Sequence, residues 1–157
     1  MKPKVYLETT VISYLTSQPS RDIITAAHQQ ATQEWWSERR DRFDVFVSQI
    51  VIQEAGSGDS EAVKRRLKAI EEITEIEVTP DAVALAQAFV TEGVVPATAA
   101  VDALHIGVAT INGMDYLLTW NLKHIANAAM RNAISEACRQ HGYEPPIICT
   151  PEELMEV

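Results

Sequence analysis

Short apolar runs rich in β-branched residues alternate along the chain with longer stretches in which apolar residues recur at helical spacing. Strands separated by helices are typical of a parallel sheet that helices cover on both faces. We therefore expect an α/β three-layer sandwich with four to five parallel strands. The apolar runs predict strands at 5–7, 44–47, 75–78, 116–119 and 147–149. The stretches between them predict helices at 9–15, 21–40, 48–56, 60–73, 80–92, 98–111 and 125–140.

Length and composition indicate one globular domain over 1–157. The chain has 157 residues, of which 46% are hydrophobic and 22% charged, and this is enough for a sizeable core. No apolar run reaches the roughly 18 residues of a membrane span, and no signal-peptide pattern precedes the first strand. The two cysteines, Cys138 and Cys149, show neither a disulfide framework nor metal-ligand spacing. A cytoplasmic protein without membrane contact is expected.

The net charge of −9 narrows the classes of function. Binding nucleic acid by charge alone requires clustered lysine and arginine, so the net charge argues against this mode. An enzyme that approaches nucleic acid through a bound metal ion remains compatible with the charge. The basic runs at 39–42 and 64–68 are interpreted as solvated helix faces, although either could contact phosphate.

Three acidic residues stand in apolar surroundings near predicted strand–helix junctions. Glu8 ends the first strand, Glu54 lies near the end of the helix after the second strand, and Asp102 lies near the start of the helix before the fourth strand. In open parallel sheets, ligands bind beyond the carboxyl ends of the strands, and all three residues belong at that edge. Three carboxylates gathered there would form a site for a hard cation such as Mg²⁺.

Each of these acids also has a purely structural interpretation. Glu8 could favour the dipole of the helix that follows it, and Glu54 could be a solvated surface acid. Asp102 could form a buried structural pair with His105, which lies three residues further on the same helix face. Asn121, after the fourth strand, could cap a helix or hold a hydrated cation.

Four stretches of the sequence, taken in order, resemble a PIN domain of the kind found in VapC-type toxins. They are VYLETTVISYL, VSQIVIQE, VDALHIGVA and YLLTWNLKHI, and their order and spacing match that family over nearly the whole chain. The resemblance implies the same parallel-sheet sandwich. It also implies an Mg²⁺- or Mn²⁺-dependent ribonuclease, the toxin component of a toxin–antitoxin pair. The expected partners are an RNA substrate and an antitoxin protein, and a homodimer is left open.

Within the resemblance, Glu8, Glu54 and Asp102 match the acidic metal-binding positions, and Asn121 matches a fourth position that is often Asp. The first position is usually Asp as well, so Glu8 and Asn121 are departures from the family pattern. The expected catalytic set is therefore Glu8, Glu54, Asp102 and Asn121. Residues expected to support it are listed last: Thr10 and Thr119, which match hydroxyl positions, and His105.

Three interpretations of the chain stay open at this point. A PIN-like fold that has lost activity through the two departures would be an RNA- or protein-binding module. A small-molecule enzyme is disfavoured because no glycine-rich phosphate loop follows the first strand. Trp35 and Trp36, on the predicted helix 21–40, could anchor an antitoxin helix or belong to the core. Trp120 could stack on a base or pack internally.

Overall fold

The computed structural model describes residues 1–155 and contains one five-stranded sheet, in the order β3-β2-β1-β4-β5. All four strand pairings are parallel, so each connection must cross over one face of the sheet. The predicted α/β sandwich is confirmed, with five strands. They are β1 (Lys4–Leu7), β2 (Asp44–Ser48), β3 (Thr74–Ile76), β4 (Tyr116–Leu118) and β5 (Ile147–Cys149).

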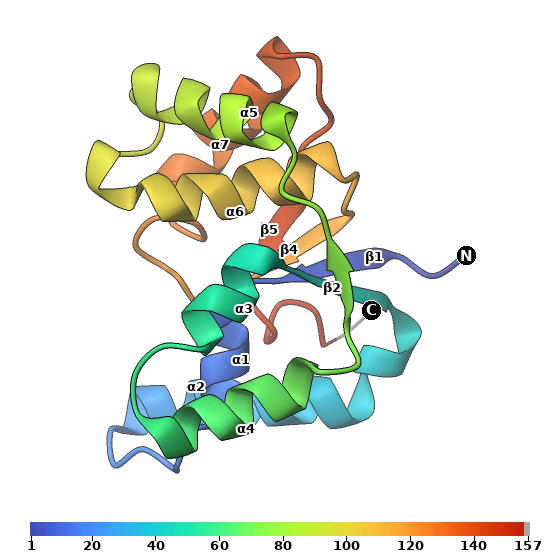
Figure 1. Cartoon of the computed structure of the whole chain (residues 1–157), viewed down its shortest axis with the longest axis vertical. Helices are drawn as coiled ribbons and strands as arrows, with labels where there is room; N and C mark the ends of the chain where they lie inside the picture. Colours follow the sequence, from blue (N-terminus) through green and yellow to red (C-terminus); the bar gives the residue numbers. More distant parts are fainter. Residues whose placement is uncertain (156–157) are drawn as a thin grey trace.

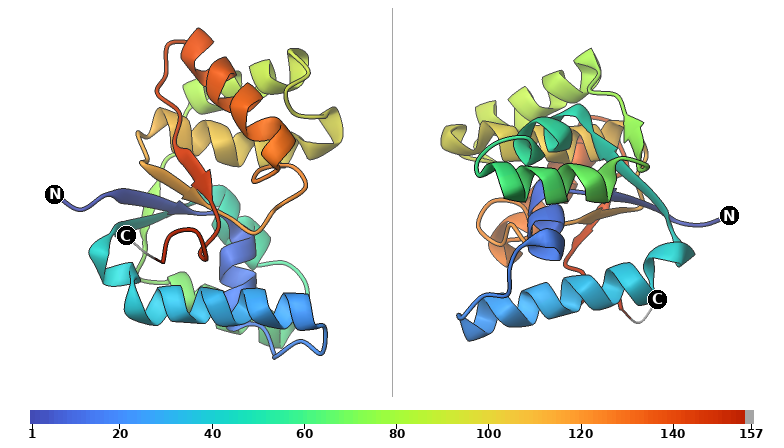
Figure 2. Two further views of the ribbon diagram at one scale, coloured as in Figure 1. Left: turned by 180° about the vertical axis from the view of Figure 1, so that it is seen from behind. Right: turned by 60° about the horizontal axis from the view of Figure 1, so that its bottom comes forward.

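Helices cover both faces of this sheet. In Figure 1, α5, α6 and α7 lie on one side of the strands, and α1, α2 and α4 lie on the other. The two further views in Figure 2 agree that α2 runs along the side opposite to α5–α7. The helices are α1 (Thr9–Thr16), α2 (Ile23–Glu38), α3 (Gln49–Ala55), α4 (Ser60–Ile70), α5 (Pro80–Thr91), α6 (Ala100–Ile111) and α7 (Ala128–Gln140), with short 3₁₀ turns at Arg40–Arg42 and Ala97–Ala99.

The central strand, β1, pairs with one strand on each side. Val5 pairs with Val45 of β2 on one side and with Tyr116 of β4 on the other. Residues 5–7 are fully buried, as expected for a strand covered on both faces. Because all the strands are parallel, the residues after β1, β2 and β4 meet at one edge. The next residue along the chain, Glu8, continues the pairing by donating its backbone N–H to the carbonyl of Leu118.

Polar residues cap three of the helices, and two of these helices start later than predicted. Asp22, Asp59 and Asn127 cap α2, α4 and α7, because each side chain accepts a hydrogen bond from a backbone N–H two or three residues later. The predicted helices 21–40 and 125–140 are therefore shorter at their starts. The predicted helix 60–73 ends at residue 70.

Hydroxyl residues near the starts of three helices do not cap them. Glu8, rather than Thr9 or Thr10, occupies the N-cap position of α1. Ser48 stands at the N-cap position of α3, but its side chain makes no capping hydrogen bond. Thr98 lies inside the 3₁₀ turn that precedes α6. The hydroxyls of Thr9, Thr10 and Ser48 are used at the carboxyl edge of the sheet instead.

The tight packing of α5 against α6 fixes the face that α6 presents to the sheet edge. A Cβ atom on Gly107 would lie 2.6 Å from the carbonyl oxygen of Ala82, closer than real Cβ contacts allow. Glycine at this position therefore lets the two helix backbones approach closely. Within residues 1–155, no helix combines the length and the apolar character needed to cross a membrane.

Candidate acidic metal site

Three side chains from three different elements converge at the carboxyl edge of the sheet. Glu8 follows β1, Glu54 is the second-last residue of α3, and His105 lies in the middle of α6. One ligand atom from each lies within 4.8 Å of the other two. In Figure 1, β1 runs from the N-terminus toward the region where α1, α3 and the start of α6 come together. The edge predicted from the sequence is thus where the two glutamates meet.

Glu8 is a buried carboxylate whose charge is met by hydroxyl groups. The residue is only 3% exposed. Its Oε1 atom accepts hydrogen bonds from the hydroxyls of Thr10 and Thr119, the latter at 2.6 Å. Burying a carboxylate without such donors would be costly, so the two threonines make this position tenable. Thr10 and Thr119, the two threonines of the sequence analysis, therefore lie beside Glu8.

These threonine hydroxyls also tie together the loops on either side of Glu8. The Thr10 hydroxyl accepts a hydrogen bond from the backbone N–H of Trp120 at 2.8 Å, and the Thr119 hydroxyl accepts one from the backbone N–H of Asn121 at 2.9 Å. Each hydroxyl therefore both donates and accepts. This arrangement fixes the segment after β4 against the start of α1, and it orients the Glu8 carboxylate.

Glu54 is held by a hydroxyl and an imidazole that share one of its oxygens. Oε1 accepts a hydrogen bond from the Thr9 hydroxyl at 2.5 Å and lies 2.6 Å from Nε2 of His105. Partial burial acts to raise the pKa of Glu54. The hydrogen bonds from His105 and Thr9 outweigh this and hold that pKa below its usual value. Glu54 therefore remains ionised at neutral pH, and its side chain is 39% exposed.

His105 is fully buried and is bonded at both ring nitrogens. Its Nδ1 atom lies 2.7 Å from the hydroxyl oxygen of Tyr6, which in turn lies 2.7 Å from the hydroxyl oxygen of Ser48. The sequence analysis assigned His105 a supporting role, but it gave no role to Tyr6, Ser48 or the Thr9 hydroxyl. The sequence Glu8-Thr9-Thr10 did hold a signal for the role of Thr9, since a hydroxyl beside a buried acid can donate to a carboxylate.

Asp102 and Asn121 lie outside the cluster of Glu8, Glu54 and His105. They are joined to each other through His124. Asp102 Oδ2 is 3.1 Å from Nδ1 of His124, and Oδ1 of Asn121 accepts a hydrogen bond from the backbone N–H of His124 at 3.0 Å. Asp102 is not among the residues whose ligand atoms gather within 4.8 Å. The proposed structural pair of Asp102 with His105 is wrong, because His105 contacts Glu54 and Tyr6 instead. Asn121 caps a turn rather than a helix.

The donor atoms of the two glutamates fit a hard divalent cation. Each carboxylate commits Oε1 to hydrogen bonds from the protein, and within residues 1–155 no group donates to either Oε2 atom. One oxygen of each glutamate is therefore left for a cation. Oxygen ligands of this kind suit Mg²⁺ or Mn²⁺, and the charge of two adjacent carboxylates favours such an ion.

Aromatic residues near the site belong to the packing of the fold. The Trp120 ring stacks on His28 with a centroid distance of 4.1 Å, and its indole N–H donates to the Thr32 hydroxyl at 2.7 Å. Trp120 is thus a packing residue in this structure. Trp35 is fully buried against Phe43, and this contradicts its interpretation as an anchor for a partner helix.

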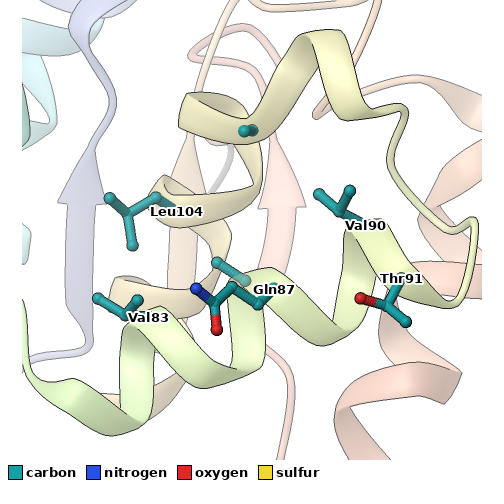
Figure 3. Close-up of a pocket in the computed structure, with 7 residues that line it drawn as sticks. Val83, Gln87, Val90, Thr91 and Leu104 are labelled. Carbon is teal, nitrogen blue, oxygen red and sulfur yellow. The ribbon is translucent and has the colours of Figure 1, made fainter.

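A separate hollow of about 390 Å³ lies between α5 and α6 and carries no acidic side chain. Figure 3 shows Val83, Gln87, Val90 and Leu104 lining it. Leu104 reaches this hollow from α6, whereas the neighbouring His105 faces Glu54. The hollow is therefore distinct from the acidic site, which uses another face of the same helix.

The parallel order β3-β2-β1-β4-β5 and the carboxylates at its carboxyl edge define an α/β domain with a candidate cation site. Two solved structures share this fold. One is a chain of VapBC2 from Rickettsia felis bound to a DNA fragment from their promoter, with a TM-score of 0.59 and 13% identity over 94% of this chain and 98% of that chain. The other is VapC20 from Mycobacterium tuberculosis, a sarcin-ricin loop cleaving toxin, with a TM-score of 0.52 and 17% identity over 72% of this chain and 86% of that chain.

The chain therefore has the fold of VapC-type PIN domains, and the resemblance drawn from its sequence is confirmed at the level of the fold. No family model and no curated protein matches the sequence. At identities this low, the shared fold does not by itself assign the chemistry, which has to be argued from the site.

Proposed function

We propose that this protein is an Mg²⁺- or Mn²⁺-dependent endoribonuclease and the toxin component of a toxin–antitoxin pair. The observation that carries the proposal is the convergence of Glu8 and Glu54 at the carboxyl edge, each with one oxygen fixed by the protein and one left over. VapC20, which shares the fold, is described as a toxin that cleaves the sarcin-ricin loop, and this description supports the same class of reaction.

Within the proposed site, Glu8 and Glu54 would hold the metal ion. Asp102, which contacts His124 outside the cluster of these two glutamates, would supply a third carboxylate at the same edge of the sheet. When bound, the ion activates water and stabilises charge on the phosphate. The hydroxyls of Thr10 and Thr119 keep the Glu8 carboxylate oriented, and Thr9 does the same for Glu54. Asn121 follows β4 at this edge and holds the segment that carries His124, the partner of Asp102.

Single-stranded or looped RNA is the substrate class that fits this arrangement. The chain carries a net charge of −9, so RNA gains little from the surface at large and must be drawn to the site itself. The backbone of unpaired RNA can be splayed toward a shallow edge site, whereas a regular duplex resists this. Glu54, which is partly exposed, is the carboxylate that such a backbone meets first.

The proposed partner is an antitoxin protein that covers the helices α1, α2 and α4. Support comes from the fold that this chain shares with the VapBC2 structure, because the name VapBC2 combines the names of two components. The buried Trp35 is not its anchor, but Ile23 and Ile24 at the start of α2 are 84% and 67% exposed. Exposed apolar residues of this size are common at sites where partners bind.

Cleavage of a mixed panel of structured and unstructured RNAs, with Mn²⁺ or Mg²⁺, tests the proposed activity. Wild type is compared with Asp102→Asn and Glu54→Gln, which keep the side-chain shape and remove one charge each. Glu61→Gln, an exposed acid on α4, is the matched control. We expect at least a 100-fold loss for Glu54→Gln and none for the control. Equal cleavage by wild type and Asp102→Asn would identify a contaminating nuclease and remove the site assignment.

A catalytically weak or inactive binding module is the second candidate. It is favoured by the near-complete burial of Glu8 and by the neutral Asn121 at a position where the family pattern often has a charge. Calorimetric titration with Mn²⁺ separates the two candidates. A metal-dependent nuclease binds the ion at micromolar to millimolar concentration, whereas absence of binding at millimolar Mn²⁺ selects the binding module.

A further inference from the structure

A row of four polar side chains, three of them fully buried, runs from the end of β2 to the carboxylate of Glu54. Its members are Ser48, Tyr6, His105 and Glu54, from four different elements. We propose that Tyr6 and His105 are positioning residues, which fix Oε1 of Glu54 through one directed chain of hydrogen bonds, and that His105 is not itself a metal ligand. This inference rests on the proposed metal-dependent function.

The distances along this row are those of good hydrogen bonds throughout. The Ser48 and Tyr6 hydroxyl oxygens are 2.7 Å apart, Tyr6 lies 2.7 Å from Nδ1 of His105, and Nε2 of His105 lies 2.6 Å from Glu54. Ser48, Tyr6 and His105 are each fully buried. Water therefore does not compete for any of the three links, and each group depends on the next for its hydrogen bond.

The direction of the chain follows from what each end can do. An ionised carboxylate only accepts, so Nε2 of His105 must carry the proton that faces Glu54. Nδ1 is then the ring nitrogen left to accept, and the Tyr6 hydroxyl 2.7 Å away is its donor. Burial raises the pKa of Tyr6, which keeps that hydroxyl protonated. Ser48 then donates to the Tyr6 oxygen, and every group in the row is satisfied.

Folding alone does not account for this row. Three polar groups in a sheet–helix core require desolvation that apolar side chains of similar size would avoid. Ser48 also stands at the N-cap position of α3, where its hydroxyl would normally bond the helix, yet it points to Tyr6 instead. The row thus gives up both a capping bond and apolar packing, and it ends on the one carboxylate of the site that is partly exposed.

A metal ligand at His105 would require the opposite arrangement. Its Nε2 atom would have to lose its proton to bind an ion, and the 2.6 Å contact with Oε1 of Glu54 would then set two acceptors against each other. A histidine that donates to a ligating carboxylate and holds its orientation is a familiar outer-shell partner in metal sites. The close gathering of Glu8, Glu54 and His105 is explained by this indirect role.

Calorimetric titration with Mn²⁺ alone, on the full chain, tests the positioning role through a double-mutant cycle. The variants are His105→Leu, Tyr6→Phe and the two combined. We expect His105→Leu to weaken Mn²⁺ binding by about 10–100-fold and Tyr6→Phe by several-fold. If Tyr6 acts through His105, adding Tyr6→Phe to His105→Leu costs nothing further, because the pathway is already broken.

Two further variants separate positioning from general destabilisation. Thr110→Val removes a buried hydroxyl from the same helix, one that bonds only within α6 and to the Cys138 sulfur, and should leave Mn²⁺ affinity unchanged. His105→Gln can place an amide donor near the position of Nε2 and should restore most of the affinity lost in His105→Leu. Equal losses in Tyr6→Phe and Thr110→Val would show that the effect is only structural.

Nitrogen NMR of His105 with and without Mg²⁺ decides between a positioning role and ligation. We expect Nε2 of His105 to carry a proton in both states. A bare Nε2 after Mg²⁺ is added would overturn the positioning role.

The proposed function and the positioning role fail in different ways. If wild type binds no Mn²⁺, the metal-dependent function is withdrawn together with its positioning residues. If wild type binds Mn²⁺ and Tyr6→Phe binds it equally well, only the positioning role is lost.

Discussion

At the scale of single residues, the site depends on hydroxyl groups as much as on acids. The Oε1 atoms of Glu8 and Glu54 each accept hydrogen bonds from two donors. Three of these four donors are the hydroxyls of Thr9, Thr10 and Thr119, and the fourth is His105. A carboxylate fixed in this way loses little further freedom when it binds an ion. The orientation of each acid is therefore set before any ligand arrives.

Shortening Glu8 to aspartate tests this dependence directly. Aspartate restores the residue type that is usual in the family, but it withdraws the carboxylate by one methylene from Thr10 and Thr119. We expect Glu8→Asp to weaken Mn²⁺ binding about tenfold or more, measured by calorimetry, because two oriented hydrogen bonds are lost. Thr119→Val, which removes one of those donors, should reproduce part of the loss. A gain in affinity in Glu8→Asp would mean that the longer side chain detunes the site.

The lowered pKa of Glu54 predicts a pH dependence of stability. A carboxyl whose pKa is lower in the folded protein stabilises the fold above its unfolded pKa, near 4.3, and this stabilisation is lost as the pH falls through the folded pKa. We expect the unfolding free energy of wild type to fall more steeply below about pH 4.3 than that of Glu54→Gln. Urea unfolding at several pH values measures both slopes, and parallel slopes would contradict the assignment.

At the scale of secondary-structure elements, α4 supports the helix that carries Glu54. Arg66 donates from Nε to the carbonyl of Ala55 at 2.9 Å and from a terminal nitrogen to the carbonyl of Ser57 at 2.5 Å. These two carbonyls lie at and just beyond the end of α3, where a cation is favourable. The basic run at 64–68 is therefore more than a solvated face, because Arg66 and Arg65 bond neighbouring backbone.

Removing the hydrogen bonds of Arg66 should affect both the stability of the fold and the metal affinity of the proposed site. We expect Arg66→Ala to lower the unfolding free energy by about 1–2 kcal/mol, because two charged hydrogen bonds to backbone are lost, and to weaken Mn²⁺ binding several-fold. Lys64→Ala is the matched control, since within residues 1–155 Lys64 pairs with the neighbouring Glu61 on the exposed face. It should change stability by less than about 0.5 kcal/mol. Equal effects of the two substitutions would exclude a supporting role for Arg66.

Element by element, the sequence predicted the interior better than the edges. The buried run Val5–Leu7 and the strand pair around it were predicted from their apolar character alone. The edge strand β3 was predicted at 75–78 but spans Thr74–Ile76, because an edge strand is partly exposed and its pattern is weak. The starts of α2 and α7 lie two or three residues later than predicted, because Asp22 and Asn127 are the residues that cap these helices.

The site was predictable as far as chain connectivity determines it. Glu8 and Glu54 follow strands and had to meet at one edge. The sequence placed Asp102 and His105 on one face of a helix, but it could not say which of them would contact Glu54. That choice depends on Tyr6, which is 99 residues from His105 along the chain and pairs with it only in the folded sheet.

At the scale of the whole molecule, the excess negative charge bears on the proposed metal site. The chain carries a net charge of −9, and two carboxylates lie together at the sheet edge. An ion that binds only the folded state stabilises it, by about 1.4 kcal/mol at ten times its dissociation constant. We expect Mn²⁺ to raise the unfolding temperature of wild type and to leave the Glu8→Gln, Glu54→Gln double variant unchanged. NaCl at equal ionic strength controls for screening, and an equal rise in both proteins would point to non-specific binding.

The central position of β1 has a consequence for how the protein is made. Its two neighbours in the sheet come from opposite halves of the chain, and the Thr119–Glu8 hydrogen bond joins residues 111 positions apart. A growing polypeptide that ends before α6 contains both glutamates, but it lacks His105 and Thr119, which hold them. The arrangement of the two carboxylates is therefore completed only after nearly the whole chain has left the ribosome, so an unfinished product carries no assembled site.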